Sequence, residues 1–105
     1  MARKKAGKKG AGAQPDMPQE FLDDMIHKGV QAHRAGRLGE AETHYRQVLD
    51  IQPDHGEANH LLGLIAFQIG RNDQAIQLIK KAIRANPDKA AFHANLGSAL
   101  QKKGR

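Results

Sequence analysis

The chain contains no cysteine among its 105 residues. It can therefore form no disulfide bond, no thiolate metal site and no cysteine nucleophile, and this composition suits a reducing compartment. Long apolar runs are also missing. No stretch approaches the roughly 18 to 20 residues that span a bilayer, and the N-terminus lacks the apolar stretch of a secretory signal. We therefore expect a cytoplasmic protein with no membrane span.

Motifs that carry catalysis are missing from the sequence, which has no glycine-rich phosphate loop and no nucleophile elbow. Six histidines are present, but His55 and His60 are five positions apart, and His27 and His33 are six apart. Neither spacing places two imidazoles on one helical face as an i,i+4 pair would. We expect no catalysis by this chain on its own, no metal and no cofactor. His33, His60 and His93 are candidates for tuning the binding of a partner near neutral pH.

Positive charge is concentrated at the N-terminus. Residues 1–18 combine five cations with several glycines and prolines and almost no large apolar side chains, which predicts a disordered basic tail. Such a tail could bind nucleic acid or an anionic surface weakly by releasing counterions. No aromatic residue lies between the cations to stack on bases, so we favour a solubilising tail and expect no specific nucleic-acid partner. The cations, which account for nearly all of the net charge of +6, are Arg3, Lys4, Lys5, Lys8 and Lys9.

Glycine, alanine and proline recur along the chain at an interval of 34 residues. A period of 34 residues is typical of the tetratricopeptide repeat, in which each copy is a helix, a turn and a second helix. The period predicts an all-α fold, an α-solenoid of about two and a half units whose antiparallel helix pairs stack to bury their apolar faces. The residues on this interval are Gly29, Gly63 and Gly97, Gly36, Gly70 and Gly104, Ala41 and Ala75, and Pro53 and Pro87.

Apolar spacing and helix-breaking residues predict where the helices begin and end. A first helix is expected over about 19–35, and Gly36 ends it by adopting a left-handed backbone. Pro53 and Pro87 end the second helix of each full repeat, and Asn72 or Asp73 is expected to cap the helix before Pro87. The predicted array occupies 19–105, with repeat 1 at about 22–55, repeat 2 at about 56–89 and a partial repeat 3 at about 90–105.

Residues at matching positions of the repeats have predictable packing roles. Glycine inside a helix costs about 1 kcal/mol relative to alanine, so glycines that recur in phase indicate that paired helices approach closely there. We expect alanine at the facing position and a bulky residue over the junction with the next repeat. The structural positions are Gly29, Ala41, Tyr45 and Pro53 in repeat 1, Leu62, Gly63, Ala75, Ile79 and Pro87 in repeat 2, and Leu96 and Gly97 in repeat 3.

In this frame residues 22–104 resemble the tetratricopeptide repeat family. Three stretches, His60 to Ile69, Ile76 to Pro87 and Phe92 to Gly97, are similar to a narrower subgroup of that family. In this subgroup the array precedes the glycosyltransferase domain of bacterial transferases of the O-linked N-acetylglucosamine type. Other such arrays precede methyltransferase or sulfotransferase domains. The resemblance implies, as an alternative function, a substrate-recognition segment of a larger transferase.

Transferases of this subgroup can line their groove with asparagines. The resemblance carries this feature over to one position, Asn95, in the triplet Asn-Leu-Gly. His27 and Leu61 hold the equivalent positions of the earlier repeats and cannot continue an asparagine ladder. The parallel with those transferases therefore rests on a single groove residue.

The first helices of stacked repeats line a concave groove that can hold a peptide or a helix of a protein partner. One acid lies at the entrance of the groove in each of the first two repeats, Asp23 and Glu57, and the floor of the groove is apolar. The lining therefore does not resemble a carboxylate clamp built from stacked lysines and arginines. A mostly apolar segment fits this lining better. The candidate partner-binding residues are Ile26, Val30, His33 and Arg34, then His60, Leu64, Phe67 and Gln68, then Asn95, Ser98 and Lys102.

The last predicted helix has a neighbouring helix on one side only. Phe92, Leu96 and Leu100 are expected to share one of its faces, which makes self-association through this uncapped helix plausible. The pair Gly104 and Arg105 matches the glycine-arginine turns of the two earlier repeats, each of which leads into another helix. This match favours a longer array.

Overall fold

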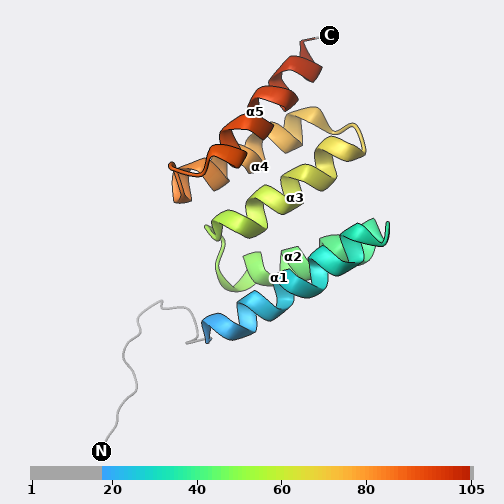
Figure 1. The fold of residues 1–105 in the computed structure, drawn as a ribbon, viewed down its shortest axis with the longest axis vertical. Helices are drawn as coiled ribbons and strands as arrows, with labels where there is room; N and C mark the ends of the chain where they lie inside the picture. The colour runs from blue at the N-terminus through green and yellow to red at the C-terminus, as the bar shows by residue number, and fades with distance from the viewer. Residues whose placement is uncertain (1–17, 105) are drawn as a thin grey trace, which may run out of the picture.

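The computed structural model describes residues 18–104, and all regular secondary structure in this part of the chain is helical. The helices form two antiparallel pairs followed by a fifth helix that packs against the second pair (Figure 1). The all-α solenoid of helix pairs predicted from the period is confirmed. The predicted basic tail lies outside the described residues, apart from Pro18. The helices are α1 Gln19–Arg34, α2 Leu38–Ile51, α3 Gly56–Gln68, α4 Asn72–Ala85 and α5 Ala90–Lys103.

Each turn inside a repeat is closed by a glycine with positive φ. Gly36 has a φ of 81° and Gly70 a φ of 86°, a region that costs glycine little because it lacks a Cβ. The amide of Arg37 donates to the Ala32 carbonyl at 2.9 Å, and the amide of Gly36 donates to the His33 carbonyl at 3.0 Å. These two bonds form a Schellman motif, which satisfies carbonyls that the end of α1 would leave unpaired. The turn after α3 repeats the same pattern of bonds.

The two prolines end the second helices as predicted. Helix α2 ends at Ile51 and α4 at Ala85, each two residues before a proline. Gln52, the residue before Pro53, has φ −136° and ψ 87°, and Asn86, which precedes the other proline, has almost the same angles. These values lie outside the helical region, as expected for a residue whose backbone would clash with the proline ring.

The prediction that Asn72 or Asp73 caps α4 is wrong. The N-cap is Arg71, and no side chain caps this helix. The Schellman turn leads directly into α4, so Asn72 is already inside the helix. A side-chain cap that was not predicted occurs instead at α3, where Nδ1 of His55 accepts a hydrogen bond from the Ala58 amide at 3.1 Å.

The facing helix packs tightly against two of the recurring glycines. A Cβ placed on Gly29 would overlap the ring of Tyr45 on the facing helix, and a Cβ on Gly63 would lie 2.9 Å from Cγ1 of Ile79. Gly97 differs, because a Cβ there would meet no atom within 4 Å. The second helix of a third repeat is not among the described residues. The close approach expected at all three glycines is therefore confirmed at two of them.

Tyr45 joins the first repeat to the second. Its side chain is fully buried, together with Ala32 and Ala41 of its own repeat and Leu62 and Ile65 of α3. Burial raises the pKa of Tyr45 to about 12, and the Glu57 carboxylate contributes to the same shift. The bulky residue predicted to cover the junction between repeats occupies that position.

The three large apolar residues of α5 that were expected to share one face differ in their exposure to solvent. Phe92 is 2% exposed and packs inward, Leu96 is half-buried, and Leu100 is 47% exposed. The three residues advance around the helix, so the later ones turn away from α3 and α4. Self-association through this surface stays a prediction.

We expect alanine to act in opposite directions at two glycines that share one repeat position. Gly97→Ala should raise the free energy of unfolding by about 1 kcal/mol, since it improves helix propensity and meets no neighbour. Gly29→Ala should lower it by about 1 kcal/mol or more, because the added methyl forces the buried Tyr45 ring to shift. Urea unfolding of both variants measures the difference. Equal effects would show that the contact with Tyr45 does not limit the separation of α1 and α2.

Candidate functional site

The first helices of the repeats, α1, α3 and α5, lie on one side of the array with α2 and α4 behind them (Figure 1). Two side-chain hydrogen bonds connect these first helices. Nε2 of His33 on α1 lies 2.7 Å from Oε1 of Gln68 on α3, and Nε2 of His60 on α3 lies 2.8 Å from Nδ2 of Asn95 on α5. Each bond joins residues 35 positions apart. The repeat therefore brings polar side chains of successive first helices together across the same surface.

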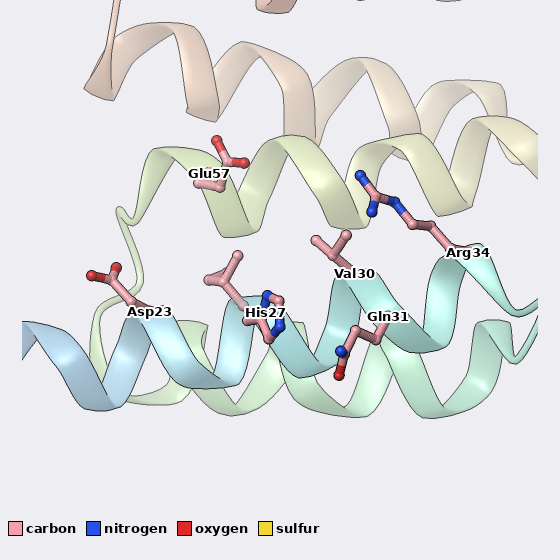
Figure 2. A pocket seen from close by; sticks show the side chains of 7 residues that line it. Asp23, His27, Val30, Gln31, Arg34 and Glu57 are labelled. Carbon is pink, nitrogen blue, oxygen red and sulfur yellow. The ribbon is translucent and has the colours of Figure 1, made fainter.

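A cavity of about 600 Å³ lies between α1 and α3 (Figure 2). It is of the size that proteins use to hold small ligands or a few side chains of a peptide. All but one of its lining residues come from α1, and the remaining one comes from the start of α3. The lining residues are Asp23, Ile26, His27, Val30, Gln31, Arg34 and Glu57.

The charged residues of this cavity are separated along α1. Figure 2 shows Asp23 and Glu57 toward the start of α1 and Arg34 toward its end, with Val30 between them. The three charged side chains belong to exposed residues, whereas Ile26 and Val30 are half-buried and pack against the hydrophobic core. The cavity thus has an apolar floor with negative charge at one end and positive charge at the other.

His60 lies below the groove surface rather than open to it. The residue is 7% exposed, and its ring stacks at 4.4 Å on the ring of Phe92, with an angle of 33° between the two planes. Nδ2 of the Asn95 amide lies 2.8 Å from Nε2 of His60 and can donate to it when the ring carries its proton on Nδ1. Burial lowers the pKa of His60, and the Glu57 carboxylate opposes this shift. His60 therefore connects α3 to α5 through its hydrogen bond to Asn95 and its contact with Phe92.

The rest of the predicted groove continues along α3 and α5. Leu64 and Phe67 are half-buried, and Nζ of Lys102 lies 5.4 Å from the centre of the Phe67 ring, within the range of a cation–π contact. Ser98 is exposed and its hydroxyl donates to the Ala94 carbonyl one turn earlier. These residues lie outside the cavity between α1 and α3.

The structure brings part of the predicted groove into one cavity. Ile26, Val30 and Arg34 line it together, whereas His33 faces Gln68 beside it. Two lining residues were not predicted, His27 and Gln31. Each directly follows a predicted floor residue in the sequence, and His27 also holds the position equivalent to Asn95. Adjacency could have identified both residues, and the repeat position could have identified His27.

A second hollow, of about 380 Å³, lies where the turn after α2 meets the end of α4. Asp54 and the cations Lys81 and Arg84 line it.

No cluster of three or more potential metal ligands occurs among residues 18–104. None of the helices in this range is long and apolar enough to cross a bilayer.

Comparisons with known proteins agree with this architecture. A family model for the tetratricopeptide repeat matches residues 32–105. The chain belongs to the tetratricopeptide repeat family. Its helices superpose on a mutant O-GlcNAc transferase of Thermobaculum terrenum with a TM-score of 0.76 and 33% identity, covering 78% of this chain and 16% of the transferase chain. The resemblance to repeats of that transferase type is therefore confirmed.

Two curated relatives carry the same kind of array. Cellulose synthase operon protein C of Komagataeibacter xylinus is 35% identical over 81 residues, 77% of this tetratricopeptide repeat chain and 6% of the relative. Photosystem I assembly protein Ycf3 of Prochlorococcus marinus strain NATL2A is 33% identical over 81 residues, 74% of this chain and 47% of the relative. The chain thus spans less than half the length of these relatives.

We expect the stability of this tetratricopeptide repeat array to fall as the pH falls below about 6.5, the ordinary pKa of a histidine in an unfolded chain. Because the folded-state pKa of His60 is lowered, the unfolded chain binds more protons in this range, and acid favours unfolding. His60→Gln should make the decrease shallower, since glutamine does not titrate. Urea unfolding of both proteins from pH 7.5 to 5.5 measures the two slopes.

The other histidines are present in both proteins, so the difference between the slopes isolates His60. Identical slopes would contradict the lowered pKa.

Proposed function

We propose that this chain is a protein-interaction scaffold that holds an extended segment of a partner protein in the cavity between α1 and α3. The observation that carries the proposal is the lining of that cavity, where half-buried Ile26 and Val30 form a floor below exposed charged residues. Apolar floors supply affinity for a peptide, and the surrounding polar groups fix its position.

The family supports this function. Repeat arrays present an extended concave surface, and such surfaces bind partner proteins. The relative from Prochlorococcus is by its name an assembly protein, which agrees with a scaffold role for this fold. The proposal assigns no catalytic activity to the chain on its own.

The proposal can be tested with a displayed library of random peptides selected on the full chain. Val30→Arg places a charge on the cavity floor and should weaken the selected peptides at least tenfold. Gln47→Arg, an exposed position on α2 outside the cavity, introduces the same side chain and should leave affinity unchanged. Fluorescence anisotropy with labelled peptides measures both.

A second cavity variant separates binding from folding. Val30 also packs against the core, so Val30→Arg could weaken binding by loosening α1. His27 is exposed and lines the same cavity, and His27→Trp should fill the cavity without disturbing the core. Thermal unfolding of each variant monitors the fold. Peptides that bind both cavity variants as tightly as the unaltered chain would contradict the proposed site.

A second candidate function is supported by the superposition on an O-GlcNAc transferase. In this proposal the chain is the array of a larger transferase and recognises the protein that is modified. Asn95 supports it, since this residue lies on α5 at the position where such a groove would carry an asparagine. Its amide is bonded to His60, so it serves the contact between α3 and α5 as well. A methyltransferase or sulfotransferase domain in the larger protein is a less favoured form of this proposal.

The gene sequence beyond the codon for Arg105 distinguishes the two candidate functions. We expect a transferase domain in the same reading frame if the second proposal holds. A stop codon, or an unrelated domain, would contradict it and leave the scaffold proposal intact. The cytoplasmic location expected from composition remains a prediction that neither outcome tests.

A further inference from the structure

We infer that the cavity between α1 and α3 selects an extended segment with a basic side chain at one end, an aliphatic side chain in the middle and an acidic side chain at the other end. This inference rests on the proposed function of the cavity. It refines the mostly apolar segment expected from the sequence, because the structure places opposite charges at the two ends of one cavity.

The negative end is built from two helices. Asp23 comes from the first turns of α1 and Glu57 from the first turn of α3, and both line the cavity. The amide of Gln19 donates to Asp23 at 3.1 Å, but neither acid forms an ion pair with another residue in the described range 18–104. Because no cation of the described part of the chain pairs with them, the two carboxylates attract a lysine or arginine of a ligand.

The positive end is Arg34, which is exposed in the last turn of α1 and also forms no ion pair within residues 18–104. It follows Asp23 by 11 positions, which corresponds to about 16 Å along a helix axis. An extended segment advances about 3.4 Å per residue, so its first and fifth residues are about 14 Å apart. Long side chains such as lysine and glutamate can extend over the remaining difference and reach both ends.

The floor determines the middle of the segment. Ile26 and Val30 lie between the charged ends of α1 and offer an aliphatic surface. Alternate side chains of an extended segment point to the same side. In a five-residue stretch, the first, third and fifth side chains can therefore meet the acids, the floor and Arg34, respectively. If the segment runs in the opposite direction, the first side chain meets Arg34 and the fifth meets the acids. A segment with two ends of one charge meets repulsion at one end in either direction.

Three nonapeptides of one length test the inference on the full chain. Each has leucine at the centre, and the residues two positions before and after it are lysine and glutamate, two lysines or two glutamates. We expect the peptide with opposite charges to bind about tenfold more tightly than the other two at low salt, since each surface ion pair gained or repulsion removed changes affinity by up to about fivefold. The preference should shrink at high salt. NMR titration measures the affinities.

Charge reversal in the protein should redirect this preference. Arg34→Glu should favour the peptide with two lysines, and Asp23→Lys combined with Glu57→Lys should favour the peptide with two glutamates. Lys80→Glu, at an exposed position on α4, is the matched control and should change nothing. All altered positions are exposed, so the fold should survive in each variant.

The outcomes separate this inference from the function on which it rests. Three results would overturn the inferred charge preference and leave the cavity as the binding site. The three designed peptides could bind equally, their order of affinity could stay the same in the charge-reversal variants, or library-selected peptides could bind while none of the designed peptides does. If no peptide of any kind depends on Val30, the proposed function itself is wrong.

Discussion

The close contact between a glycine on the first helix of a repeat and a bulky side chain on the second is the constraint on which the structure depends. Gly29 meets Tyr45, and Gly63 meets Ile79. These contacts let the paired helices approach closely, so that the buried bulky residue can also reach the next repeat, as Tyr45 does at Leu62 and Ile65. In the first repeat, one set of contacts therefore holds the helix pair together and attaches it to its neighbour.

The groove is a consequence of this packing. Because the second helices lie behind, the first helices face a common side, and hydrogen bonds such as that between His33 and Gln68 connect them across it. Val30 faces the cavity and also packs against the core cluster that contains Tyr45. In the proposed site, stability and binding would be coupled through such residues, whereas the charges at the cavity ends are exposed and lie outside the core. Selectivity among partners is accordingly expected to lie in Asp23, Glu57 and Arg34.

The fold alone does not specify a partner, because proteins with quite different names contain the same array. A cellulose synthase operon protein, a photosystem I assembly protein and an O-GlcNAc transferase all match this chain at similar identity. Their shared feature is a stack of helix pairs, and function depends on the side chains placed on that stack. In this chain the side chains on that stack line a cavity with opposite charges at its ends.

Local rules were enough to predict the helices, because a glycine that must adopt positive φ and a residue before proline act through their immediate neighbours. Gly36, Gly70, Pro53 and Pro87 therefore determined the turns from the sequence by itself. The cap at His55, the burial of His60 and the open space around Gly97 were decided by tertiary structure. Each of these features depends on which helix or turn lies opposite. The same holds for the cavity that Glu57 lines together with residues of α1. A repeat period specifies that helices pair, but the atoms that face one another across a pair are known only once the pair has formed.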